Sequence, residues 1–331
     1  MSSSLIRRLS AGLLLGFLVF LGLVLVGDLR QVSARVLSFR WGLYPLVLGL
    51  TLFNYTLRFV KWHFYLGQIG VRNLSIPQSA RLFVAGFPLA VTPGKVGEAL
   101  KAVWLEQASG IPVGRGIAVV VAERISDALG LLVLSTLGVI AYPRYWPAFV
   151  TLLILMLSMV VVTQIRPLAL GLLDFGERLP LVKRFVHTLR EFYEGSFALF
   201  RPRTALIAVG LGTVSWLGEG IGFFLILTGF GLPPGWQLLS VAVFVLAFAT
   251  VVGGASTLPG GLGAAEALID SMLVFLLGLE KDVAAAGTLL IRFATLWFGV
   301  SLGMLVWSFS PQLLRPVPNS NPAGSAPTVD S

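Results

Sequence analysis

Charged side chains stand inside long apolar stretches of this sequence, where a charge is costly. A charge within a spanning helix costs roughly 2.5–3.5 kcal/mol on insertion scales, so each one needs a partner or a wet cavity. Cations that converge in such a cavity would bind an anion, and carboxylates beside them would balance charge or carry protons. The residues concerned are Arg58, Lys95, Glu98, Lys101, Glu123, Arg124 and Asp127 in the first half and Glu219, Glu266, Asp270 and Arg292 in the second.

These charges follow a motif that occurs twice. Residues 93–100 and 259–268 both contain P-G-x-x-G followed by E-A-L, although the second copy has two extra alanines before its Glu. In each copy the Glu, Glu98 or Glu266, precedes an Arg, Arg124 or Arg292, by 26 positions. Proline ends a helix and glycine permits a tight turn, so each copy predicts a helix break. A duplicated break with a charge behind it is typical of transporter cores.

We predict one polar site built from both copies. Glu98 and Lys101 stand three apart and Glu123 and Asp127 four apart, so each pair shares a helix face. The glycines leave backbone N–H groups unshielded at the start of the next helix, where the positive dipole end suits phosphate or carboxylate. The predicted substrate-binding residues are Lys95, Gly97, Glu98, Lys101, Glu123, Arg124, Asp127, Gly261, Gly263, Glu266 and Arg292.

A structural alternative is equally open. Glu98 could pair with Arg124, and Glu266 with Arg292, as buried ion pairs that merely lock each hairpin to a span.

The elements that must position these residues are membrane helices. The chain has 331 residues, 56% of them apolar and 12% charged, with a mean hydropathy of +0.89, which is too apolar for one soluble core. We predict an all-α polytopic membrane protein with about six full spans of ~20 residues plus two helix-break hairpins, re-entrant or full. The predicted spans are Leu9–Val26, Leu43–Val60, Ile117–Ala141, Trp146–Ile165, Ala205–Phe230 and Ala284–Phe309.

The two hairpins differ in length. The apolar pieces on either side of Pro93 are too short to cross, which favours a re-entrant hairpin, whereas each arm around Pro259 is long enough to span. The span before the first break runs outside to inside and its counterpart runs inside to outside, so the halves form an inverted-topology repeat.

Basic residues concentrate in alternate connections, which places both termini in the cytoplasm. Lys61 is one of these loop cations, and the net charge of +9 therefore does not imply nucleic-acid binding.

We expect a single membrane domain over 1–310, comprising a first span and loop (1–40), a first repeat half (41–165), a cytoplasmic amphipathic connector (166–203) and a second repeat half (204–310). Residues 311–331 are expected to be a disordered tail.

Several kinds of site are excluded or disfavoured. Cysteine is absent, which excludes disulfides and thiol chemistry, and His63 and His187 lie in separate polar connections without a ligand spacing. We therefore expect no metal and no cofactor. The tryptophans at span ends, Trp62 and Trp104 among them, are expected in an interfacial belt without a substrate role.

The sequence resembles the flippase-like family that includes the transmembrane region of bacterial lysylphosphatidylglycerol synthetase/flippase. Three segments carry the resemblance: T-P-G-K-V-G-E-A-L-K (92–101), E-R-I-S-D-A-L-G (123–130) and L-P-G-G-L-G-A-A-E (258–266). The resemblance covers about 41–309. It implies a domain that moves an amphiphilic lipid, such as an aminoacylated, glycosylated or polyprenyl-phosphate lipid, between leaflets of a bacterial or archaeal cytoplasmic membrane. This chain lacks the aminoacyl-transferase domain, so lysylphosphatidylglycerol synthesis is not expected.

The leading hypothesis is a non-enzymatic lipid flippase whose partner is a membrane lipid. Lys95, Lys101, Arg124 and Arg292 would attract the lipid phosphate. A secondary transporter of a small anion would need the same cations in a closed pocket. An intramembrane enzyme acting on lipid-linked phosphate, with Glu123 and Asp127 as its carboxylates, ranks third because no nucleophile and base set is evident. The sequence leaves the oligomeric state open.

Overall fold

A computed structural model describes residues 29–92, 97–141, 146–167, 171, 185–256 and 258–314 of the chain. Every regular element in these ranges is helical, which confirms the all-α expectation. Five of the helical segments described are long and apolar enough to cross a bilayer: Trp41–Gln68, Pro202–Gly229, Trp236–Ala255, Pro259–Leu277 and Lys281–Phe309.

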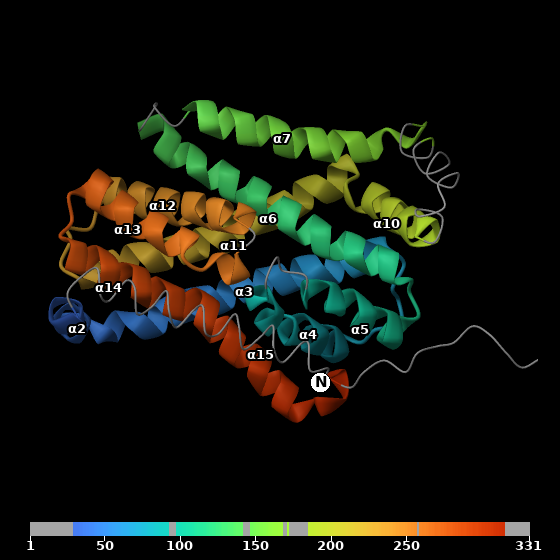
Figure 1. Ribbon diagram of the computed structural model, residues 1–331, viewed down its shortest axis with the longest axis horizontal. Coiled ribbons are helices and arrows are strands. Elements are labelled where there is room, and N and C mark those ends of the chain that lie inside the picture. The colour runs from blue at the N-terminus through green and yellow to red at the C-terminus, as the bar shows by residue number, and fades with distance from the viewer. Residues whose placement is uncertain are drawn as a thin grey trace, which may run out of the picture.

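The helices follow one another in a long bundle (Figure 1). The first half contains α2 (Leu29–Ser38), η1 (Trp41–Leu43), α3 (Tyr44–Gln68), α4 (Ile76–Ala85), η2 (Phe87–Val91), α5 (Ala99–Ser109), α6 (Val113–Ala141) and α7 (Trp146–Gln164). The second half contains α10 (Val186–Leu199), α11 (Pro202–Gly229), α12 (Trp236–Ala255), η5 (Pro259–Gly261), α13 (Ala264–Leu277), α14 (Lys281–Arg292), η6 (Phe293–Trp297), α15 (Phe298–Phe309) and η7 (Pro311–Leu314).

The predicted spans fall on helices wherever the structure describes them. Leu43–Val60, Ala205–Phe230 and Ala284–Phe309 match three of the five candidate spans, and Ile117–Ala141 and Trp146–Ile165 match α6 and α7. The predicted first span and residues 315–331 lie outside the described residues. The tail prediction is wrong for residues 311–314, which form η7, where Trp104 Nε1 donates to the Leu313 carbonyl at 2.8 Å.

The loop expected before residue 41 is partly helical. Residues 29–38 form α2, whose Arg35 hydrogen-bonds both Glu280 and Asp282 at the start of α14. Opposite charges on two elements hold them together only modestly when exposed, and Arg35 is nearly half exposed. This contact nevertheless orients α2 along the second half of the molecule.

The two helix breaks differ in the length of their arms. In the first break α4 has 10 residues and α5 has 11, or about 15–17 Å of helix against a hydrocarbon core of ~30 Å. This agrees with the prediction that these arms are too short to cross. In the second break the arms are 20 and 19 residues long. The turn η2, which precedes the first break, packs against η5 of the second break.

Local sequence explains where the short helices start and stop. Ser75 begins α4: its backbone N–H donates to the Gln78 side chain at 3.2 Å, so the two residues form a capping box. Gly110 ends α5 with φ of 75° and Gly278 ends α13 with φ of 65°. Only glycine adopts this left-handed conformation without strain, so each glycine stops its helix.

Long helices from the two halves cross at small residues. α3 and α6 both pack on α11, and α6 runs diagonally across the bundle in Figure 1. A Cβ atom on Gly130 of α6 would lie 2.8 Å from the Thr213 backbone nitrogen of α11. Gly303 of α15 is tighter still, since a Cβ atom there would lie 2.2 Å from Pro88 Cδ. Close backbone approach at small residues is how membrane helices gain packing energy without a hydrophobic driving force.

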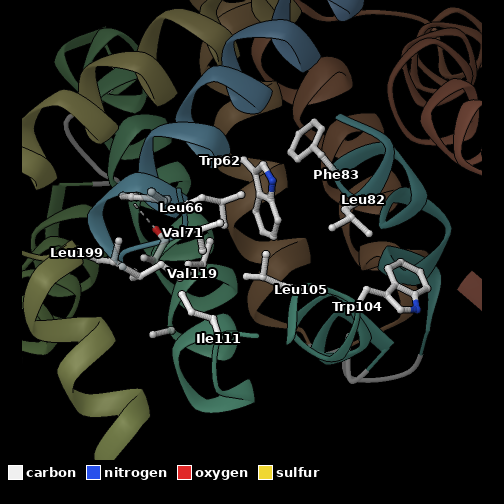
Figure 2. Close-up of a cluster of buried hydrophobic side chains, with 14 of the residues drawn as sticks. Trp62, Leu66, Val71, Leu82, Phe83, Trp104, Leu105, Ile111, Val119 and Leu199 are labelled. Atoms are coloured by element: carbon white, nitrogen blue, oxygen red, sulfur yellow. Dashed lines mark hydrogen bonds between the residues drawn. The ribbon is translucent and has the colours of Figure 1, made fainter. Parts of the chain in front are cut away.

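Two main clusters of buried apolar side chains stabilise the bundle. One joins α3, α4, α5, α6 and α15, and part of it, including Trp62, Phe83 and Leu105, is drawn in Figure 2. The other joins α11, α12, α13 and α14 around residues such as Phe244 and Ile269. α15 connects the halves, since Trp307 Nε1 donates to the Ala85 carbonyl of α4 at 2.9 Å.

Three assignments to loops or membrane interfaces were wrong. Lys61 and His63 lie within α3 rather than in a polar connection, because α3 continues to Gln68, and Lys61 is fully buried. Trp62 and Trp104 are also buried, so neither belongs to an interfacial belt. The His63 ring Nδ1 lies 3.0 Å from Ser79 Oγ of α4. This end of α3 is therefore packed inside the protein.

Candidate functional site

A cavity of about 430 Å³ lies among helices of both halves. Its wall includes apolar residues of both buried clusters, such as Phe83 and Val300 of the first and Leu132 and Leu246 of the second. Seven charged side chains also reach its wall: Arg58, Glu98, Lys101, Arg124, Asp127, Glu219 and Arg292. The cavity therefore combines apolar walls with a group of charges of both signs.

Both repeat copies form the ion pair that their matching spacing suggested. In the first half Arg124 Nε lies 3.4 Å from Glu98 Oε2, and in the second Arg292 Nε lies 2.5 Å from Glu266 Oε1. The first pair is looser, since its two atoms lie farther apart. It is also more accessible: the Arg124 side chain is 35% exposed, whereas that of Arg292 is 13% exposed. The two hairpins are thus tied to their spans in equivalent ways but with unequal tightness.

The second pair has an additional anchor at the helix break. Arg292 Nη2 donates to the Gly260 carbonyl at 2.9 Å, so one guanidinium binds both α13 and the turn before it. Arg292 ends α14, and the chain continues into the π-helical turn η6. In that turn the Thr295 carbonyl accepts a hydrogen bond from the Tyr55 hydroxyl of α3. π-helical turns are frequent at functional sites because they redirect side chains and free backbone groups.

Lys101 has an aromatic surrounding as well as a counter-ion. Its Nζ lies 2.8 Å from Glu123 Oε2, 4.2 Å from the centre of the Trp62 ring and 5.3 Å from that of Phe83. Figure 2 shows the Trp62 and Phe83 rings close together in the first buried cluster. The Lys101 stem fits only because Gly86 has no side chain, since a Cβ there would lie 2.6 Å from Lys101 Cδ. The ammonium is thereby held at the cavity wall.

Asp127 is shared by two cations of α3. Lys61 hydrogen-bonds its Oδ1, while Arg58 Nε lies 3.5 Å from its Oδ2. The Arg58 guanidinium also lies 5.7 Å from the centre of the Trp216 ring. Among the described residues the buried Nε atoms of Arg58 and Arg124 have no hydrogen-bond partner. These two guanidinium groups at the cavity wall can therefore accept an anion without breaking a strong hydrogen bond at Nε.

Glu219 of α11 is the exception among the charged wall residues. It is 3% exposed, yet it forms no ion pair within 4.0 Å and no hydrogen bond with the part of the chain that the structure describes. Arg58 and Arg292, which line the same cavity, are close enough to act on this carboxylate electrostatically. A buried carboxylate without a close partner is costly and is usually retained for a function.

Three of the glycine amides that were predicted to be unshielded have hydrogen-bond partners within the chain. The Gly97 N–H donates to Thr92 Oγ1 at 2.9 Å, that of Gly261 to the Leu258 carbonyl at 2.9 Å, and that of Gly263 to Glu266 Oε2 at 2.7 Å. These donors have internal partners and are not available to a ligand. Glycine is required there for shape, because Gly263 has φ of 87° and Gly261 has φ of 69°.

The structure separates the predicted side chains into two groups. Glu98, Lys101, Arg124, Asp127 and Arg292 meet at the cavity wall. Glu123 and Glu266 lie behind the wall as partners of Lys101 and Arg292. Lys95 lies outside the described residues, as do its neighbours in the first break.

Sequence reasoning left out four residues of this site. Arg58 and Glu219 stood out as intramembrane charges but were not assigned to the site, and Lys61 was assigned to a loop. The three-residue step from Arg58 to Lys61 puts them on one helix face, which was the available signal. Trp216 lies on the wall without any such signal.

Comparison with known proteins identifies the family. The family model described as lysylphosphatidylglycerol synthase TM region matches residues 13–303. The chain belongs to this family. The match includes every charged residue of the cavity wall, so the site lies wholly within the family's region. Membership in this family of membrane regions, together with several bilayer-length helices, makes the chain a multi-pass membrane protein.

Other members of similar length are archaeal membrane proteins. A UPF0104 membrane protein of Methanothermobacter thermautotrophicus is 29% identical over 63% of this chain and 67% of its own length. A second UPF0104 membrane protein from the same organism is 24% identical over 88% of this chain and 90% of its own length. A UPF0104 membrane protein of Pyrococcus horikoshii is 25% identical over 74% of this chain and 80% of its own length. The lysylphosphatidylglycerol synthase TM region family thus includes relatives that align with this chain along most of their length.

Proposed function

We propose that this protein moves a phosphate-bearing lipid between the leaflets of the bacterial or archaeal cytoplasmic membrane and performs no covalent chemistry. The observation that carries the proposal is the cavity, whose wall holds Arg58, Lys101, Arg124 and Arg292 among helices of bilayer length. Intramembrane cations facing a cavity mark a substrate path, and guanidinium groups suit phosphate geometry.

The size and walls of the cavity support a lipid headgroup. Its volume of about 430 Å³ is near the lower end of the range for small-molecule sites, which suits a headgroup but not long acyl chains. The wall also contains apolar residues, such as Phe87, Leu131 and Leu296. The phosphate would bind the cations while the acyl chains stay in the bilayer.

The paired breaks support an alternating mechanism. Each break is linked by a Glu to an Arg of a long helix, and η2 touches η5. In an inverted repeat with both termini in the cytoplasm, rocking of one half against the other would expose the cavity to each leaflet in turn. The looser Glu98–Arg124 pair would open first to a phosphate, while the tighter Glu266–Arg292 pair keeps the other side closed.

The test is lipid flipping in proteoliposomes containing phosphatidylglycerol labelled with a dithionite-quenchable fluorophore on an acyl chain. We expect wild type to expose the inner-leaflet label, Arg124→Gln to lose this activity, and Arg166→Gln to keep it. Arg166 is a matched control, because it also forms an ion pair, with Glu194 at 3.0 Å, but lies outside the cavity wall.

Native mass spectrometry with lipid extraction complements this test. A phosphate-bearing lipid enriched on wild type and lost from Arg124→Gln would extend the assay to that lipid. Failure of wild type to flip either the labelled phosphatidylglycerol or any lipid recovered in this way would overturn the proposal. Uptake of glycerol phosphate by the same vesicles would then favour a small-anion transporter.

A further inference from the structure

The charges around the cavity do not balance without Glu219. Among the described residues, four sets of ion pairs join five cations to four carboxylates. The cations are Arg58, Lys61, Lys101, Arg124 and Arg292, and the carboxylates are Glu98, Glu123, Asp127 and Glu266. One positive charge therefore remains. The carboxylate of Glu219, which lines the same cavity as Arg58 and Arg292, can neutralise it in the empty cavity when it is ionised.

A bound phosphodiester changes this balance. It brings one further negative charge into a buried site, and an uncompensated buried charge costs several kcal/mol. The phosphate would also take the position of counter-charge to Arg58 and Arg292. The carboxylate that can then be neutralised most easily is the one without an ion pair, because protonating any other would leave a buried cation unpaired.

We infer that Glu219 binds a proton whenever a lipid phosphate occupies the cavity, so that lipid and proton cross the membrane together. The proton is taken from the aqueous side on which the lipid enters and is released from the carboxyl oxygen on the opposite side when the phosphate leaves. This inference rests on the proposed lipid transport, and it names a proton gradient as the energy source of that transport. The cavity carries the same net charge when lipid and proton are bound as when it is empty. The protein can therefore undergo the same structural transition in both states.

The neighbours of Glu219 come from every helix packed on α11 at this level. α3 contributes Tyr55 and Arg58, α6 contributes Asp127, and Arg292 ends α14. α12 has no charged residue in its sequence. Asp127 is already bonded to Lys61, and Tyr55 donates its proton to the Thr295 carbonyl. Glu219 is therefore the carboxylate in this group that is left to exchange a proton.

The test measures flipping of labelled phosphatidylglycerol in proteoliposomes while a pH gradient is imposed across the membrane. We expect the wild-type flipping rate to respond to the gradient by up to about tenfold per pH unit, because the proton acts as a co-substrate. Glu219→Gln, which mimics the protonated side chain, should flip lipid more slowly than wild type, because its empty cavity keeps the extra positive charge, and the flipping that remains should not respond to the gradient. Asp270→Asn should keep it, since Asp270 of α13 is also a membrane carboxylate with an unpartnered Oδ1 but lies off the cavity wall.

A second measurement uses only the wild-type protein, in case Glu219→Gln does not fold. Calorimetric titration of detergent-solubilised protein with phosphatidylglycerol, in buffers of different ionisation enthalpy, counts protons taken up on binding. We expect uptake of about one proton per lipid. Lipid binding without proton uptake, flipping that ignores the gradient, or an unchanged response in Glu219→Gln would each overturn the inference and leave the proposed function standing. Absence of flipping in wild type overturns both.

Discussion

The Lys101–Glu123 pair offers a test that separates a structural role from a role in transport. Lys101 Nζ lies 2.8 Å from Glu123 Oε2, and the two side chains are 6% and 0% exposed. Lys101→Met keeps the stem that crosses Gly86 but leaves the Glu123 carboxylate buried without its partner. Breaking a buried pair in this way costs about 3–5 kcal/mol. Loss of the contact with the Trp62 ring contributes about 0.5–2 kcal/mol of this.

The double variant Lys101→Met/Glu123→Gln removes both charges together. Replacing both members of a buried ion pair by neutral groups of similar volume is often close to neutral for stability. We therefore expect the double variant to recover most of the lost unfolding free energy, with a coupling energy of at least about 2 kcal/mol. Lipid flipping should remain lost in the double variant, because the cavity wall no longer carries the Lys101 charge.

The assay combines denaturant unfolding in detergent micelles with flipping in proteoliposomes, for wild type, both single variants and the double variant. A double variant as unstable as Lys101→Met would refute the reasoning about the unpaired carboxylate. A double variant that regains both stability and flipping would show that the pair is structural and that Lys101 does not bind substrate.

Two further predictions concern the packing of the helix breaks. Gly303→Ala places a Cβ against Pro88 and should lower the unfolding free energy by about 1–3 kcal/mol in the same unfolding assay. Gly210→Ala is the control: a Cβ there meets nothing within 4 Å, so this change should be neutral or stabilising. Equal effects would contradict the packing argument. Thr92→Val removes the hydroxyl oxygen that accepts the Gly97 N–H and should lower the unfolding free energy by about 1–3 kcal/mol in that assay. An unchanged unfolding midpoint would show that this hydrogen bond does not stabilise the protein.

The class of protein and the ion-pair partners within each repeat could be predicted from the amino-acid sequence. Long apolar runs require helices in a bilayer, because backbone groups there must be bonded internally. The equal 26-residue step from Glu98 to Arg124 and from Glu266 to Arg292 anticipated two pairs that the structure contains. Local chemistry likewise located the second helix break, where Pro259 begins η5 after α12 has ended, whereas Pro93 of the first break lies outside the described residues.

Which charges share the cavity, and which lie behind its wall, depends on how the helices pack and could not be predicted from the sequence. Lys61 looked like a loop cation by its place after an apolar run, but α3 continues past it and Asp127 of α6 provides its partner. The carboxylates singled out from the sequence as possible proton carriers are paired. Glu219, which was not assigned to the site, is the carboxylate of the cavity wall without a close partner among the described residues. Burial and pairing depend on distances between helices remote in sequence, and a pattern along one helix does not contain them.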